Sequence, residues 1–200
     1  MFDAVFLAPL FLFAFTASAT PGPNVLMLAA SGVNFGFRRT VPHMAGIVIG
    51  FPVMIVAVGL GLGELFTRFP LLHQVLKGLG AAYLLWLAWK IANASSVSGD
   101  KQAAKPFGFF QAAGFQWVNP KAWIMAISAI AAFATLEASF AGQVMMIALV
   151  FGLVGIPSVI IWAAFGTGIR RYLKSDRHLR LFNRTMALLL VASLIPAFWP

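Results

Sequence analysis

Six apolar stretches, each about the length that crosses a bilayer as a helix, run through this chain of 200 residues. They cover residues 4–31, 41–62, 71–91, 109–133, 142–166 and 181–199. Charged residues make up only 10% of the chain, against roughly 25% in soluble domains. Hydrocarbon offers the backbone no hydrogen-bond partner, so a spanning segment must satisfy its own peptide groups as a helix. We therefore predict an all-α integral membrane protein with six transmembrane helices.

The remaining composition excludes several classes of function. The net charge of +9 is carried by Lys and Arg between the apolar stretches, where such residues orient a membrane protein, so nucleic-acid binding is not expected. There is no cysteine, and the three histidines lack metal-ligand spacing, so we expect no disulfide and no metal site. The sequence also lacks a nucleophile elbow, a zinc-helix motif and a phosphate-binding loop. We expect neither an enzyme nor a cofactor.

Basic residues are concentrated in three of the five connections between the apolar stretches. These connections contain Arg38 and Arg39; Lys90, Lys101 and Lys105; and the cluster from Arg170 to Arg184. Basic loops stay in the cytoplasm, so the pattern predicts that both termini lie outside it. Ala17-Ser18-Ala19 resembles a signal-peptide cleavage site, but no positive charge precedes it. We expect this segment to be kept as the first transmembrane helix.

Glycine and proline clusters indicate an internal duplication. Gly50-Phe51-Pro52 matches Gly155-Ile156-Pro157, and at the same offset Gly61-Leu62-Gly63 matches Gly166-Thr167-Gly168. A repeat of three spans must insert upside down relative to the first, which gives an inverted-topology repeat. We predict one three-helix repeat over 1–92, a cytoplasmic linker over 93–108 and a second repeat over 109–200. The alternative is that glycine and proline are simply common in membrane helices.

The first apolar stretch is interrupted by Thr20-Pro21-Gly22-Pro23-Asn24. Proline lacks a backbone N–H and clashes with the carbonyl one turn back, so this run predicts a helix break. The new helix that begins near Pro23 would present free N–H groups to a carboxylate. Thr20 and the carbonyls before it would accept from an ammonium group. The alternative is a kink that only shapes helix packing.

The fourth apolar stretch is interrupted by Asn119-Pro120-Lys121. A charge at the centre of a membrane helix costs about 2.5–3.5 kcal/mol, so Lys121 should face a wet cavity or a partner. Alternatively, the fourth helix begins near Pro120 and Lys121 extends to the interface. Matched breaks in two halves are typical of a transporter's binding site.

Weaker candidates lie outside these two runs. Tyr83, in the third stretch, can line a cavity or serve packing. Glu64 and Glu137 occupy matching ends of their spans, but no carboxylate lies mid-membrane, so the residues do not indicate how protons would couple. His43 is the other titratable candidate, and a neutral packed histidine is the more common outcome.

These motifs together resemble the LysE/RhtB superfamily of bacterial amino-acid exporters. The motifs are Thr20-Pro21-Gly22-Pro23-Asn24, Gly36-Phe37-Arg38 with Ala45-Gly46, Gly80-Ala81-Ala82-Tyr83-Leu84-Leu85-Trp86-Leu87-Ala88-Trp89-Lys90, and Phe115-Gln116-Trp117-Val118-Asn119-Pro120-Lys121. The third and fourth motifs look most similar to the cysteine/O-acetylserine exporter branch. The resemblance implies a six-span inner-membrane protein that exports amino acids and is driven by the proton motive force.

The resulting hypothesis is a secondary transporter that works by alternating access. The substrate carboxylate binds the N–H groups after Pro23, with Asn24 and Lys121 as polar partners. Thr20, Gln116 and Asn119 contact the ammonium group or the side chain. The rival interpretation is a non-transporting membrane scaffold or lipid-binding module. Small residues in the third and fifth stretches are compatible with a homodimer.

Overall fold

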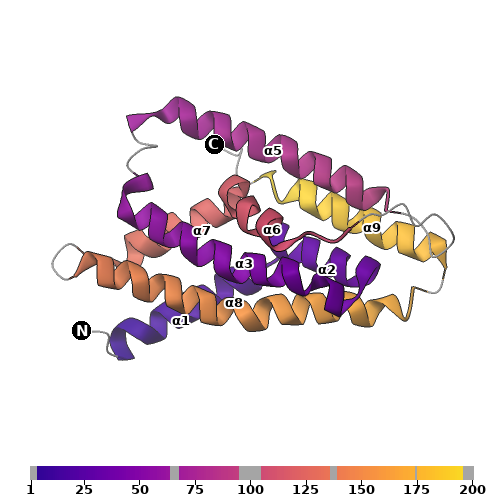
Figure 1. Cartoon of the computed structure of the whole chain (residues 1–200), viewed down its shortest axis with the longest axis horizontal. Helices are drawn as coiled ribbons and strands as arrows, with labels where there is room; N and C mark the ends of the chain where they lie inside the picture. Colours follow the sequence, from indigo (N-terminus) through magenta and orange to yellow (C-terminus); the bar gives the residue numbers. More distant parts are fainter. Residues whose placement is uncertain (1–3, 64–67, 95–104, 136–138, 174, 196–200) are drawn as a thin grey trace.

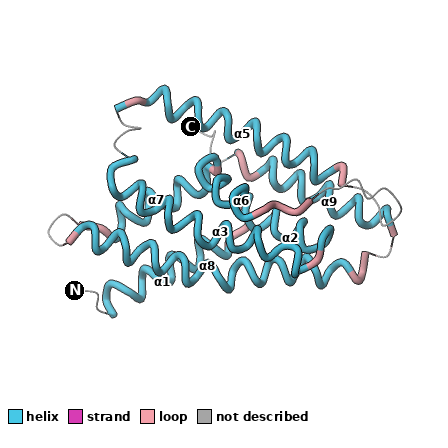
Figure 2. The backbone as a smooth tube through the Cα atoms, viewed as in Figure 1, coloured by secondary structure: helices cyan, strands magenta, loops and turns pink. Residues whose placement is uncertain are grey.

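The computed structural model describes residues 4–63, 68–94, 105–135, 139–173 and 175–195 (Figure 1). These ranges are helical, with short connections and no strand (Figure 2). The α-helices are α1 (Ala4–Ala19), α2 (Pro23–Phe35), α3 (Phe37–Ala57), α5 (Pro70–Ala92), α6 (Phe109–Phe115), α7 (Pro120–Phe133), α8 (Phe140–Arg170) and α9 (Asp176–Ala192). A π-helical turn, η1 (Val58–Leu62), extends α3, and a 3-10 turn, η2 (Gln116–Val118), follows α6. The prediction of an all-helical protein is confirmed.

Three helices within the described ranges are long and apolar enough to cross a membrane. They are Phe37–Leu62, Gln74–Ala92 and Phe140–Arg170, and a fourth candidate is the pair Val5–Ala19 and Pro23–Phe35, bent by 52°. The expected fourth span is divided into α6, η2 and α7, and the expected sixth span is described only to residue 195. The number six therefore stays a prediction. Glu64, Glu137 and residues 95–104 of the expected linker lie outside the described residues.

The longest helix, α8, organises one side of the bundle. Its 31 residues extend for about 46 Å, and α1 and α2 pack along it one after the other (Figure 1). On the next side, α3 packs against both α8 and α6, and α5 pairs with α9 at the outer edge. This arrangement places both interrupted segments beside α3 and α8, in the middle of the protein.

Glycines allow the helices to approach closely around these segments. A Cβ on Gly32 of α2 would collide with the Ala163 carbonyl of α8, and a Cβ on Gly166 would collide with the Ala29 carbonyl of α2. Gly46 and Gly50 of α3 meet the backbone of α6 in the same way. Close packing of this kind supplies the van der Waals contacts that hold helices together in lipid. Most residues of α2 are consequently buried.

The matched Gly/Pro clusters play different local roles. Gly61 has a φ of 116°, which favours glycine, and it forms a kink within η1. Its counterpart Gly166 lies within the continuous helix α8 and serves packing. Pro52 and Pro157 both lie inside unbroken helices. The match in sequence therefore does not correspond to a match in local geometry at every position.

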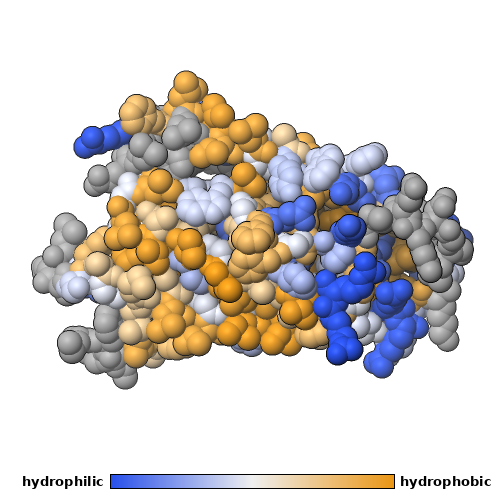
Figure 3. Space-filling view, in the orientation of Figure 1, coloured by the Kyte–Doolittle hydropathy of each residue, from blue (hydrophilic) through white to orange (hydrophobic). Residues whose placement is uncertain are grey.

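Hydrophilic residues gather at one end of the bundle, on the right in Figure 3. This end contains the start of α3, the last turns of α5 and α8, and the first turns of α9. The described basic residues there include Arg38, Arg39, Lys90, Arg170, Arg171, Arg177 and Arg180. The opposite end is largely apolar, and α1 begins near it (Figure 1). The charge asymmetry predicted from the loops is therefore also present in three dimensions.

Candidate functional site

The first break separates α1 from α2 where the proline-rich run predicts it. Gly22 caps α2 in an extended conformation, with a φ of −174°, and Pro23 follows at the first helical position. No side chain among the described residues caps this end, although the first N–H groups of a helix lack partners within it. Asn24 and Val25 of this first turn line a cavity. The uncapped end has the chemistry of an anion-binding site.

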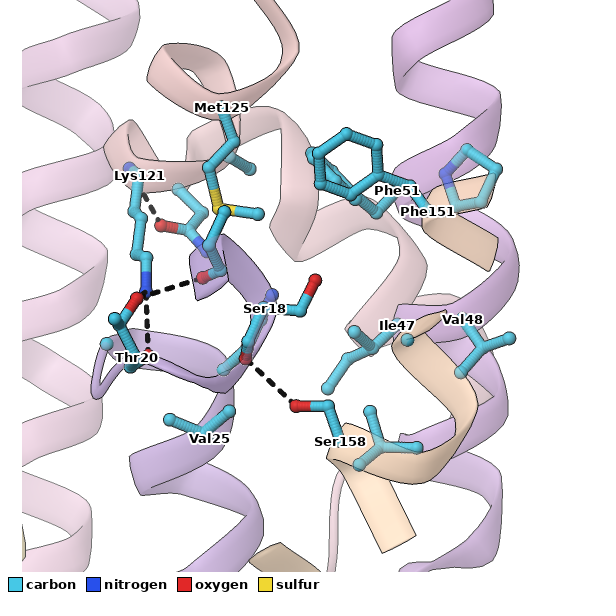
Figure 4. A pocket seen from close by; sticks show the side chains of 18 residues that line it. Ser18, Thr20, Val25, Ile47, Val48, Phe51, Lys121, Met125, Phe151 and Ser158 are labelled. Carbon is cyan, nitrogen blue, oxygen red and sulfur yellow. Dashed lines mark hydrogen bonds between the residues drawn. The ribbon is translucent and has the colours of Figure 1, made fainter. Parts of the chain in front are cut away.

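The carbonyl groups that the break leaves at the end of α1 are bound by distant side chains. Ser158 of α8 donates its hydroxyl to the Ser18 carbonyl at 2.9 Å. The Lys121 ammonium donates to the Thr20 carbonyl at 2.7 Å and to the Thr20 hydroxyl at 2.8 Å (Figure 4). These partners come from α7 and α8, in the other half of the chain. The first break is therefore held in place from outside its own segment.

The second break lies between η2 and α7 and satisfies its polar groups locally. Asn119 is extended, with a ψ of 109°, and its side chain accepts from the Lys121 N–H at 3.1 Å. The Trp123 indole donates to the Trp117 carbonyl at 2.8 Å, across the break. Pro120 begins α7, where its missing N–H carries no penalty. The predicted interruption of the fourth stretch is confirmed.

A pair of amide side chains joins the two breaks. Asn24 donates to the Gln116 oxygen at 2.8 Å, and Gln116 donates to the Asn24 oxygen at 3.2 Å. Gln116 is fully buried and also donates to the Ala112 carbonyl at 2.8 Å. Together with the Lys121–Thr20 contact, this pair fixes the first break against the second.

A cavity of about 60 Å³ lies beside both breaks (Figure 4). Its polar lining is Ser18, Thr20, Gly22, Asn24, Asn119, Lys121 and Ser158. Its apolar lining includes Ile47, Val48, Phe51, Met125 and Phe151. Lys121 is half-buried, and it is the one ionisable side chain among the described residues that line this cavity. Such a site can hold a small molecule that has charged groups at one end and an apolar group at the other.

The structure brings most of the predicted site residues together. Thr20, Gly22, Asn24, Asn119 and Lys121 line the cavity. Pro21, Pro23 and Pro120 shape the breaks, and Gln116 acts through Asn24.

Tyr83 lies elsewhere in the protein. Its ring stacks on Trp86 with centroids 5.5 Å apart and packs near Phe115 with centroids 6.0 Å apart.

Ser158 lines the cavity but was not predicted from the sequence. Its one signal was a hydroxyl next to Pro157 in an otherwise apolar stretch.

Comparisons with known proteins show the family to which this chain belongs. The LysE type translocator family matches residues 15–193. The chain is 34% identical over 182 residues to the cysteine/O-acetylserine efflux protein of Salmonella paratyphi A. The aligned residues cover 90% of this chain and 91% of that protein. It is 31% identical over 181 residues to the protein of that name in Escherichia coli K12, with coverage of 90% and 91%. It is 29% identical over 196 residues to the one in Shigella flexneri serotype 5b, with 98% of each chain covered. No solved structure matches. The chain belongs to the LysE type translocator family.

Proposed function

We propose that this protein is a secondary transporter that exports small amino acids or close derivatives across the bacterial inner membrane. The observation that carries the proposal is the Lys121–Thr20 contact, which joins the two helix breaks at one polar cavity. Matched breaks in a membrane protein are the expected form of a transporter's binding site. The substrate class is supported by the relatives, which are named cysteine/O-acetylserine efflux proteins.

The cavity offers complementary partners for the two charged groups of an amino acid. A substrate carboxylate would bind the uncapped N–H groups at the start of α2 and the Lys121 ammonium. The substrate ammonium would bind the Thr20 carbonyl and hydroxyl, which accept from Lys121 in this structure. Substrate binding therefore replaces the direct Lys121–Thr20 contact by two contacts to the same molecule. The side chain would face Phe51, Met125 and Phe151.

Alternating access, inverted repeats and proton coupling are part of the proposal. Helix α1 of the first unit packs on α8 of the second, and α6 of the second unit packs on α3 of the first. Such reciprocal packing is expected of two inverted units, 1–92 and 109–200. The basic end is assigned to the cytoplasm and both termini to the opposite side. A Cβ on Gly78 of α5 would meet no described atom within 4 Å, which leaves this face open to a second copy in a homodimer.

Whole-cell efflux tests the proposal against a non-transporting scaffold. Cells that overexpress the protein should release L-cysteine and O-acetyl-L-serine faster than deletion cells and should tolerate higher L-cysteine. The Lys121→Met variant, at equal membrane abundance, should give the deletion phenotype. Equal extracellular levels in overexpressing and deletion cells would refute export and favour the scaffold.

A further inference from the structure

A second cavity, of about 100 Å³, lies nearer the basic end of the bundle. It is enclosed by α2, α3, the last turns of α5 and residues 105–107. Its polar and charged lining consists of Ser31, Asn34, His43, Lys90 and Lys105. None of these residues belongs to the cavity at the two breaks. Its apolar lining includes Met27, Leu87 and Phe107.

His43 is the unexplained residue of this cavity. Its side chain is 1% exposed, and neither ring nitrogen has a hydrogen-bond partner among the described residues. Its ring packs against the Phe107 ring in a T-shaped contact, with centroids 5.3 Å apart. Buried polar side chains are nearly always hydrogen-bonded, so one that lines a cavity indicates a molecule bound there.

The other polar side chains already have protein partners. The Ser31 hydroxyl is 2.9 Å from the Thr40 hydroxyl. Asn34 donates to the Ala30 carbonyl at 2.8 Å and to the Asn183 side chain at 2.9 Å. These contacts hold α2 against α3 and α9. His43 is therefore the one buried polar side chain of this lining that has no hydrogen-bond partner among the described residues.

Two lysines give the cavity a positive charge. Lys90 and Lys105 line it, both are exposed, and no acidic residue is among its described lining. The Lys90 ammonium lies 4.6 Å from the centroid of the Trp86 ring, which restrains its position. A cleft lined by one sign of charge concentrates ions of the opposite sign. The complement of this lining is a carboxylate on a small, partly apolar molecule.

The second cavity is lined by two of the helices that line the first. Both use α2 and α3: Asn24 and Ile47 line the cavity at the breaks, while Ser31 and His43 line this one. The offset along α2 is seven residues, or roughly 10 Å. The α2 residues between them are buried. The cavity that contains His43 therefore lies nearer the basic end of α2 and α3 than the cavity that contains Lys121.

We propose that this cavity is an entry site, where the carboxylate of the transported amino acid binds His43, Lys90 and Lys105 before transfer to the breaks. The inference rests on the proposed function and adds a second site on the same route. It predicts two binding sites per chain for one substrate. Different substitutions should abolish binding at each of the two sites.

Equilibrium binding of radiolabelled O-acetyl-L-serine to the full-length protein in neutral-lipid nanodiscs tests the inference. The wild type should bind two equivalents. His43→Phe, which keeps an aromatic ring at this position but removes the ring nitrogens, should bind one. The double variant Lys90→Gln with Lys105→Gln changes only exposed side chains and should weaken the same site by about tenfold or more. Arg171→Gln removes a positive charge that lies over Tyr172 outside the cavity, and it should bind two.

Lys121→Met separates this inference from the proposed function. The Lys121→Met variant should bind one equivalent of O-acetyl-L-serine, and the double variant with His43→Phe should bind none. A single wild-type equivalent that Lys121→Met abolishes and neither His43→Phe nor the lysine variant alters would overturn the entry site and leave the proposed function standing. No binding by the wild type would overturn both. If anionic lipid displaces the His43-dependent equivalent, the cavity belongs to a lipid headgroup and the entry site is wrong.

Discussion

The two helix breaks differ in how their free backbone groups are satisfied. The second break uses its own segment: Asn119 caps α7, and Trp123 binds the Trp117 carbonyl. The first break uses distant residues, Lys121 and Ser158, and the start of α2 has no side-chain cap among the described residues. The second break can therefore form locally, whereas the first depends on tertiary contacts. A substrate can compete for those contacts, which makes the first break the part that responds to binding.

The largest effect is expected from Pro21→Ala combined with Pro23→Ala. Restoring two N–H groups and removing both rings should let α1 and α2 join into one helix, which removes the cavity. Export should fall to the level of deletion cells while the protein remains in the membrane fraction. Pro9→Ala is the matched control, because Pro9 lies inside unbroken α1 and export should be retained. Normal efflux by the double variant would show that the first break is not needed.

A nearly equal effect is expected from Lys121→Met. The change removes the donor to Thr20 and leaves no cation among the described lining of the cavity. Proteoliposome transport of O-acetyl-L-serine should fall by about a hundredfold, from the loss of one charged hydrogen-bond partner. Lys121→Arg keeps the charge but changes its geometry, so it should keep partial activity. If all three proteins were equally active, Lys121 would be only an interfacial residue.

Gly22→Ala and Gly114→Ala compare the first break with a control position inside α6, using the smallest possible change. A Cβ on Gly22 would lie 2.6 Å from the Lys121 Cδ, whereas a Cβ on Gly114 would have no described atom within 4 Å. The φ of Gly22 suits any residue, so its expected effect comes from displacing Lys121. Transport by Gly22→Ala should fall several-fold, and Gly114→Ala should be unchanged. Equal rates for the two variants would remove the steric argument.

The smallest effect is expected from Asn119→Ala, which removes the local cap of the second break. Loss of an N-cap costs about 1 kcal/mol, so the protein in detergent should unfold at a lower temperature. Asn119→Asp retains an acceptor and should unfold close to the wild type. Transport per folded molecule should change less than in Gly22→Ala. A larger loss of transport than of stability would assign Asn119 a direct contact with substrate.

Proline chemistry made the two breaks predictable from sequence. Pro21, Pro23 and Pro120 act within one turn of their own position, so the place of each break in the sequence needs no tertiary information, whereas the groups that stabilise the first break do. The burial cost of a charge likewise placed Lys121 at a cavity. Proline alone does not predict a break, because Pro52 and Pro157 each lie inside an unbroken helix.

The partners across the bundle were not predictable in the same way. Lys121 and Thr20 are 101 residues apart, and their direct contact depends on how α7 packs beside α1. Ser158 had no signal beyond a hydroxyl in an apolar stretch, and Tyr83 packs on aromatic side chains outside the cavity at the breaks. Such contacts depend on tertiary packing, which a single sequence does not specify.

The central claim is that the cavity between the breaks is wet and holds substrate. Because the chain has no cysteine, Met125→Cys inside the cavity and Ile127→Cys on the exposed face of the same helix form a matched pair. In membranes, a charged methanethiosulfonate reagent should modify Met125→Cys much faster, and O-acetyl-L-serine should slow only that reaction. Equal slow labelling of both cysteines, with no protection by substrate, would contradict the account.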